Sequence, residues 1–219
     1  MVSETVSVSV PGNVDLAGDL EVPPSSRGVV LFAHGSGSSR HSPRNRAVAE
    51  ALRRNGWGTL LMDLLTEDEE RSDALSGQFR FDIELLGERT AIAVDWLAKH
   101  PSTSGLPVHV FGASTGAAAA LVAAAERPDR VVSVVSRGGR PDLAGGAVGR
   151  VRVPVLLLVG GRDEHVLDLN RKAAEELPET HRVQVVPGAS HLFEEPGALE
   201  QVAAAARDWF LQSAGSGPG

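Results

Sequence analysis

Residues 108–126 read VHVFGASTGAAAALVAAAE: a short apolar run, a turn of small residues and a stretch of alanines. The run Val108–Phe111 predicts a buried strand, and Ala117–Glu126 predicts a helix. The turn Gly112–Gly116 fits the pattern G-x-S-x-G with Ser114 at its centre. Small residues two before and two after the serine suit a tight strand-to-helix turn, where larger side chains would clash. Such a turn lifts the serine hydroxyl clear of the sheet, where it can act as a nucleophile.

Strand and helix patterns alternate along the rest of the chain. Residues 5–10 and 14–22 flank a turn and predict an opening hairpin. Apolar runs predict strands at 28–33, 58–63, 131–135, 155–159 and 182–186, and periodic segments predict helices at 45–55, 81–99, 169–177 and 199–211. The acidic run 66–70 is interpreted as a solvated face. The alternation predicts an α/β fold with a doubly wound parallel sheet and right-handed crossovers.

The composition is close to that of soluble globular proteins, with 42% hydrophobic and 22% charged residues among 219. It predicts a single domain over residues 1–212 and a flexible tail over 213–219. The net charge of −7 disfavours nucleic acid as a partner. The lack of cysteine excludes disulfides, thiolate nucleophiles and cysteine-ligated metals. Without a signal sequence or a membrane-length apolar stretch, we expect a cytoplasmic protein that does not bind membranes.

Two polar residues follow predicted strands and complement the serine. The strand 155–159 leads into Asp163, and the strand 182–186 leads into His191. Because the carboxyl ends of parallel strands meet at one edge of a sheet, we expect both side chains to lie near Ser114. A serine nucleophile needs a base, and the base needs a third group that fixes its tautomer. His191 and Asp163 are the candidates for these two roles.

Other histidines and carboxylates are weaker candidates. His165 lies only two residues from Asp163, and Asp142 lies several residues into the loop after the strand 131–135. His34 is expected to order its loop through hydrogen bonds. No histidine or carboxylate cluster has metal-ligand spacing, so the sequence predicts neither a metal nor another cofactor.

With these residues in the order serine, aspartate, histidine, the sequence resembles a small α/β-hydrolase of the dienelactone-hydrolase-like group. The resemblance covers nearly the whole chain. It rests on four motifs: Phe32-Ala33-His34-Gly35, the serine turn Gly112–Gly116, Gly161-Arg162-Asp163 and Gly188-Ala189-Ser190-His191. It implies an α/β-hydrolase fold with an eight-stranded, mostly parallel sheet and helices on both faces. Dienelactone hydrolase itself uses a cysteine nucleophile, whereas this chain contains no cysteine.

Acyl transfer at Ser114 would build an oxyanion, which backbone N–H groups can stabilise. Thr115, the residue after the serine, is expected to supply one donor. The loop after the strand 28–33 is expected to supply the second, with Ser36 first and Gly37 next in line. Both loops consist of small residues, which allow the backbone to approach a substrate closely.

Arginines border these loops and have two interpretations. Arg40 and Arg44 lie just beyond the predicted oxyanion loop, and Arg137 and Arg140 follow a predicted strand. They are candidates for holding a substrate carboxylate or phosphate. For the first two we favour structural pairing with the acidic run 66–70 instead.

The segment between Val135 and Val151 has only about fifteen residues, so no cap domain is expected and the site should be open. The sequence therefore predicts a serine hydrolase of the carboxylesterase type. Its partner would be a small-molecule ester, cleaved through an acyl-serine intermediate by a monomer or homodimer. The alternative is a non-hydrolytic enzyme of the same fold, such as a lyase, cyclase or dehydratase. A noncatalytic binding module is disfavoured because serine, aspartate and histidine are all present.

Overall fold

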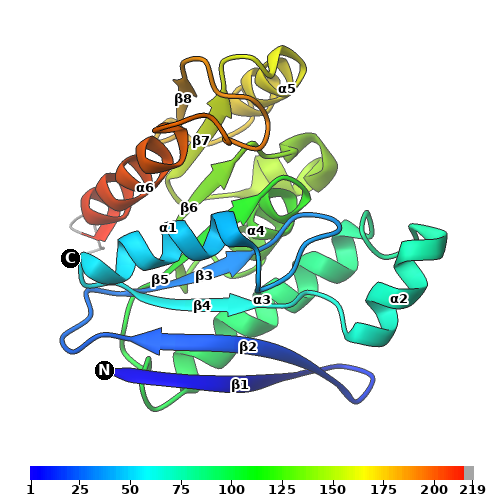
Figure 1. Ribbon diagram of the computed structural model, residues 1–219, viewed down its shortest axis with the longest axis vertical. Coiled ribbons are helices and arrows are strands. Elements are labelled where there is room, and N and C mark those ends of the chain that lie inside the picture. Colours follow the sequence, from blue (N-terminus) through cyan, green and yellow to red (C-terminus); the bar gives the residue numbers. More distant parts are fainter. Residues whose placement is uncertain (215–219) are drawn as a thin grey trace.

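The computed structural model describes residues 1–214, which form an eight-stranded sheet with helices against both faces (Figure 1). The strands are β1 Val2–Val10, β2 Val14–Val22, β3 Val29–Ala33, β4 Gly58–Met62, β5 Val108–Ala113, β6 Val131–Arg137, β7 Val155–Gly160 and β8 Arg182–Val186. They are ordered β1-β2-β4-β3-β5-β6-β7-β8. Strands β3 to β8 run parallel, whereas β2 pairs antiparallel with both β1 and β4. The predicted fold is confirmed.

The helices form a layer on each face of the sheet (Figure 1). They are α1 Pro43–Arg54, α2 Glu67–Ser76, α3 Ile83–Lys99, α4 Thr115–Glu126, α5 Glu164–Ala174 and α6 Ala198–Ala214, with a 3-10 segment, η1, at Pro141–Arg150. Leu52 of α1 and Phe210 of α6 belong to one apolar core. Leu86 of α3 and Leu121 of α4 belong to the other. The two cores hold the layers to opposite faces of the sheet.

The register of the sheet brings the ends of its central strands together. Ala113 at the end of β5 lies opposite Arg137 at the end of β6. Gly160 at the end of β7 lies opposite Val186 at the end of β8. The loops after these strands therefore leave the sheet at one edge, as the alternating pattern predicted.

The acidic segment after β4 differs from its prediction. The run 66–70 was expected to be a solvated face, and residues 67–76 form a helix that was not predicted, α2, on which Glu67 and Asp68 are exposed. Thr66 begins the helix with a capping box: its hydroxyl accepts from the Glu69 N–H, and the Glu69 carboxylate accepts from the Thr66 N–H. The T-x-x-E spacing is visible in the sequence and could have predicted this helix.

Two other boundaries also differ. Helix α5 begins at Glu164, directly after β7, rather than at residue 169. Helix α6 extends to Ala214, into the segment predicted as a tail, and residues 215–219 lie outside the described residues. Between β6 and β7, residues 138–154 contain η1. Nowhere in residues 1–214 is there a helix with the length and apolarity needed to cross a membrane.

Gly116 sets how closely α4 approaches the sheet. A Cβ at this position would lie 2.2 Å from the carbonyl oxygen of Ala33 and 2.4 Å from that of His34. Both contacts are with backbone atoms, which cannot move aside as a flexible side chain can. The turn at Ser114 therefore requires glycine two residues later.

We predict that Gly116→Ala lowers the free energy of unfolding by at least about 3 kcal/mol, because overpacking against backbone is not relieved by a rotamer change. Chemical denaturation would measure the loss. Gly146→Ala is the matched control, since the nearest atom to its new Cβ is the tip of Arg150 at 3.8 Å. The interpretation is wrong if both variants change stability by less than about 1 kcal/mol.

Candidate active site

Ser114 occupies a strained turn between β5 and α4. Its φ of 53° and ψ of −121° are rarely adopted by residues that carry a Cβ. Its N–H donates to the carbonyl oxygen of Arg137 at 3.1 Å, and its carbonyl accepts from the N–H of Arg140 at 3.2 Å. These bonds fasten the turn to the end of β6, and Ser114 remains half-buried rather than enclosed.

Asp163 and His191 are in direct contact. The Nδ1 atom of His191 lies 2.7 Å from Oδ2 of Asp163. An ionised carboxylate only accepts hydrogen bonds, so Nδ1 carries the hydrogen and Nε2 is the unprotonated nitrogen of the neutral ring. Asp163 precedes α5 but makes no side-chain cap bond to it, so its carboxylate serves His191 instead. The pair joins the loops after β7 and β8.

His191 and Ser114 border the same two residues at the end of β6. The carbonyl of Arg137 holds the Ser114 N–H, and a Cβ on the next residue, Gly138, would lie 3.6 Å from Cε1 of His191. The structure therefore brings Ser114, Asp163 and His191, from three distant parts of the chain, to one part of the sheet edge.

Glu195 ties the two loops of this pair together and was not anticipated from the sequence. Its Oε2 accepts from the Ser190 N–H at 3.0 Å, and its Oε1 lies 3.5 Å from Nη1 of Arg162. The hydrogen bond from the Ser190 N–H lowers the pKa of Glu195 and so favours its charged form. Ser190 precedes His191 and Arg162 precedes Asp163, so one carboxylate steadies both partners.

His34 organises the loop after β3, which confirms its predicted role. Its Nδ1 lies 2.9 Å from the carbonyl oxygen of Gly35, and its Nε2 accepts from the Leu64 N–H at 3.0 Å. The carbonyl requires the hydrogen on Nδ1, and the N–H requires a bare Nε2, so the ring is neutral. Burial, opposed by the Gly35 carbonyl, lowers the pKa of His34.

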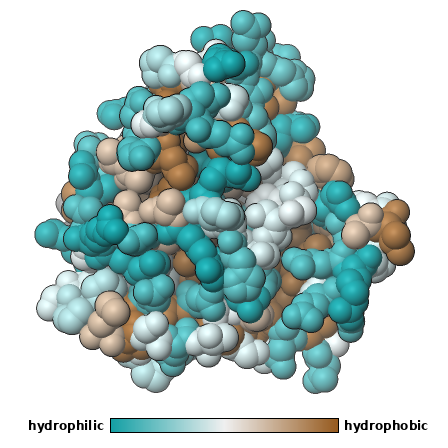
Figure 2. Space-filling view, viewed as in Figure 1, coloured by the Kyte–Doolittle hydropathy of each residue, from teal (hydrophilic) through white to brown (hydrophobic). Residues whose placement is uncertain are grey.

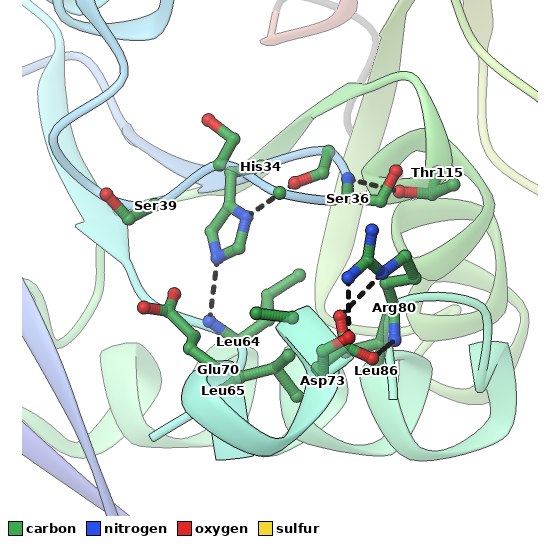
Figure 3. Close-up of a pocket in the computed structure, with 14 residues that line it drawn as sticks. His34, Ser36, Ser39, Leu64, Leu65, Glu70, Asp73, Arg80, Leu86 and Thr115 are labelled. Carbon is green, nitrogen blue, oxygen red and sulfur yellow. Dashed lines mark hydrogen bonds and ion pairs between the residues drawn. The ribbon is translucent and has the colours of Figure 1, made fainter. Parts of the chain in front are cut away.

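The two predicted oxyanion donors touch each other. The Ser36 N–H donates to Oγ1 of Thr115 at 2.8 Å (Figure 3). This amide is therefore already engaged by a neutral side-chain acceptor. Gly37, next in the loop, is exposed and has a φ of 68°.

A cavity of about 310 Å³ opens beside these donors, between residues 34–39 and helix α2 (Figure 3). Its polar end contains Ser36 and Thr115. Its lining also includes the apolar side chains of Leu64, Leu65, Ala74 and Leu86 and the charged side chains of Glu70, Asp73 and Arg80. The cavity is large enough for a small organic group.

Helix α2 forms one wall of this cavity and is anchored by Asp73. The Asp73 carboxylate accepts from the backbone N–H groups of Phe79 and Arg80 at 2.7 and 2.9 Å, and from Nε of Arg80 at 2.7 Å. Glu70 lies on the same wall, where burial raises its pKa (Figure 3). One side of α2 thus lines the cavity, whereas Glu67 and Asp68 are exposed, as expected of a solvated face.

The arginines before and within α1 pair with carboxylates, but not with those predicted. Arg40 pairs with Asp63 at the end of β4, and Arg44 pairs with Glu194 at 3.3 Å. The run 66–70 pairs with arginines of α2 and α3 instead. The structural interpretation of Arg40 holds, but its ion-pair partner is Asp63 rather than a residue of the run 66–70.

The rival residues are engaged or remote. Asp142 accepts hydrogen bonds from Nε and Nη2 of Arg140 at 2.9 and 2.7 Å, and these donors lower its pKa. His165 is exposed at the start of α5, whereas His191 contacts Asp163. No group of three or more histidine, aspartate or glutamate side chains is placed to hold a metal ion within residues 1–214.

The sheet order, the strained serine turn and the aspartate–histidine pair define the class: this is an α/β-hydrolase. The sequence profile of the dienelactone hydrolase family matches residues 16–213. The chain belongs to that family.

Individual relatives agree with this assignment. A dienelactone hydrolase from Anabaena variabilis has a TM-score of 0.93 and 56% identity, covering 96% of this chain and 97% of that chain. The esterase domain of a Rhodothermus marinus protein has a TM-score of 0.75 and 18% identity, covering 97% and 99%, which supports the fold alone.

Two further relatives are longer proteins. Mycobacterium tuberculosis proteins with the provisional name phosphoribosyl transferase are 59% identical over 210 residues. The match covers 95% of this chain and 46% of theirs. The chain therefore spans about half the length of these curated relatives.

We predict that His34 titrates below pH 6.5. Because its pKa is lowered on folding, the unfolded state binds more protons below pH 6.5, and stability falls as the pH falls. The slope from this group is at most about 1.4 kcal/mol per pH unit. Nitrogen-15 NMR of the imidazole should show the hydrogen on Nδ1 at pH 6. A titration midpoint for His34 above pH 6.5 would contradict this result.

Proposed function

We propose that this protein is a serine hydrolase that cleaves small or accessible carboxylic esters, lactones included, through an acyl intermediate on Ser114. The observation that carries the proposal is the His191–Asp163 contact of 2.7 Å at the same sheet edge as the strained Ser114 turn. A hydroxyl, a base with a bare Nε2 and a carboxylate that fixes its tautomer are the parts that acyl transfer needs.

In the proposed reaction, Nε2 of His191 takes the proton of Ser114 as Oγ attacks the ester carbonyl. Asp163 stays ionised and stabilises the imidazolium that forms. The imidazolium then returns its proton to the alcohol as the C–O bond breaks, leaving an acyl-serine. Water attacks this ester while His191 accepts a proton from the water, and the imidazolium then returns that proton to Oγ as the acyl C–Oγ bond breaks, which releases the acid and regenerates Ser114.

We assign the oxyanion to the N–H groups of Thr115 and Ser36. The Thr115 amide begins α4, so the positive end of the helix dipole adds to its effect. The Ser36 amide donates to Oγ1 of Thr115 when no substrate is bound. A charged oxyanion is a stronger acceptor than a hydroxyl, so substrate attack would draw this N–H away from Thr115.

The cavity beside Ser36 and Thr115 is proposed to hold one side of the ester. Its volume of about 310 Å³ suits a short acyl or alcohol group. The Anabaena relative is named for a lactone, which is an internal ester and follows the same chemistry.

The name phosphoribosyl transferase belongs to longer proteins, and the region that matches this chain covers only 46% of their length. The residues described here supply a hydroxyl, an imidazole and a carboxylate in contact with that imidazole. We therefore derive the proposal from this site and not from that name.

We predict that Ser114→Ala lowers kcat for short p-nitrophenyl esters by at least about 10³-fold, because the nucleophile is lost. A fluorophosphonate should add once to the wild type and not to the variant, as intact-mass analysis would show. Ser104→Ala, in the exposed loop before β5, is the control and should match the wild type.

Equal labelling of wild type and Ser114→Ala would contradict the proposal. Labelling of Ser114 without turnover of any ester or lactone would instead favour the non-hydrolytic alternative on the same fold.

We predict that Thr115→Val raises kcat/KM by about two- to tenfold, because the Thr115 hydroxyl no longer competes with the oxyanion for the Ser36 N–H. This factor corresponds to the net free energy of one neutral hydrogen bond. Valine keeps the shape of threonine without its hydroxyl. Thr115→Ser keeps the hydroxyl and should behave as the wild type. A fall of tenfold or more in Thr115→Val would show that the hydroxyl itself serves the oxyanion and that the assignment of the Ser36 amide is wrong.

A further inference from the structure

Arg137 is a buried cation at the end of β6. The residue is only 8% exposed, and its Nε and Nη1 atoms have no hydrogen-bond partner in the described structure. Burial, with a smaller effect of Arg44, lowers its pKa to about 10, which still leaves it charged at neutral pH. A buried charge without a counter-charge is strongly unfavourable, so binding of an anion would stabilise this side chain.

The contacts of Arg137 are with neutral groups. Its Nη2 donates to Oδ1 of Asn45 at 3.3 Å, and its Cζ lies 5.9 Å from the centre of the Phe193 ring. Among residues 1–214, no carboxylate lies within ion-pair distance of its guanidinium. The amide and the ring position the side chain but do not neutralise it.

A second arginine lies close enough for its charge to contribute to the lowered pKa of Arg137. Arg44 precedes Asn45 in the first turn of α1, and its Nε is also buried without a partner. The helix contributes the positive end of its dipole at the same place. Two arginines and a helix N-terminus thus meet where the side chain of Arg137 leaves the sheet.

The carboxylate nearest to this cluster is only loosely bound. Glu194 lies 3.3 Å from Nη1 of Arg44, but the two side chains are 63% and 33% exposed. Exposed pairs of this kind contribute little to stability, so a stronger anion can displace Glu194. The face over α1 is largely hydrophilic, which allows a charged ligand to approach (Figure 2).

The cluster adjoins the proposed catalytic residues. The Arg137 carbonyl accepts from the Ser114 N–H, and Phe193 lies in the loop of His191. A Cβ on Gly138 would lie 3.3 Å from the Phe193 ring and 3.6 Å from Cε1 of His191. An anion on Arg137 and Arg44 can therefore belong to a molecule that also reaches Ser114.

We propose that Arg137 and Arg44 bind a phosphate group, and that the ester cleaved at Ser114 carries it. With Glu194 displaced, the cluster has two positive charges and three unpartnered nitrogen donors, which match a phosphate dianion better than a carboxylate. The binding site stands on its own geometry. Its assignment to the substrate rests on the proposed hydrolase activity.

Binding is tested with inorganic phosphate as the probe, at constant ionic strength, by calorimetry and thermal unfolding. Phosphate at ten times its Kd should raise the Tm of the wild type by about 3–6 °C, and acetate at the same concentration should raise it less. Arg137→Met should abolish the phosphate shift and remain folded, because an apolar side chain of similar length replaces an uncompensated charge.

Two further variants sharpen the binding test. Glu194→Gln should lower the Kd for phosphate by about two- to fivefold, because it removes the competing carboxylate. Arg140→Met, at an arginine already paired with Asp142, should leave the phosphate shift unchanged. An equal phosphate shift in wild type and Arg137→Met would overturn the site, and a larger response to acetate than to phosphate would overturn its ligand class.

The substrate assignment is tested with two p-nitrophenyl esters of one chain length, one ending in phosphate and one in its neutral dimethyl ester. The wild type should prefer the phosphate-bearing ester by at least tenfold in kcat/KM, and Arg137→Met should lose that preference. An equal preference in both proteins would overturn the assignment. If neither ester is cleaved, the proposed hydrolase function fails, whereas calorimetry still decides whether the phosphate site exists.

Discussion

Helix α4 approaches the end of β3 so closely that a Cβ at Gly116 would lie 2.2 Å from the Ala33 carbonyl oxygen, so this position has room only for glycine. Two residues before this glycine, the chain turns at Ser114 with a positive φ. In this turn the Ser114 N–H donates a hydrogen bond to the Arg137 carbonyl at the end of β6, and the Thr115 hydroxyl accepts one from the Ser36 N–H. The close approach at Gly116 and these two hydrogen bonds together fix the serine, its neighbour and the loop after β3.

Polar anchors fix the remaining loops around this turn. His34 joins the loop after β3 to the end of β4 as a neutral ring that donates once and accepts once. Glu195 fastens both the loop of Asp163 and the loop of His191. The side chains of His34 and Glu195 each contact groups of complementary charge or hydrogen-bonding type. Arg137 breaks this rule, since it is buried and charged without an anion, which is why it points to a ligand.

Much of this arrangement follows from sequence because it depends on local patterns. Apolar runs predict the central strands, and parallel topology then places the residues after them at one edge. The contact between Asp163 and His191 agrees with that reasoning. Side-chain pairings could not be obtained in this way: Arg44 contacts Glu194, which is remote in the chain and has no motif. Helix α2 was missed because its acidic surface lacks apolar periodicity, although its capping box at Thr66 was visible.

We infer that Ser114, His191 and Asp163 act together at one edge of the sheet. A crystal structure of the wild type after reaction with diethyl p-nitrophenyl phosphate tests it most directly. We expect phosphorus bonded to Oγ of Ser114, its oxygen within hydrogen-bond distance of the Thr115 and Ser36 amides, and Nε2 of His191 facing Oγ. Phosphorus on another residue, or a His191 ring turned away from Ser114 in the adduct, would contradict it.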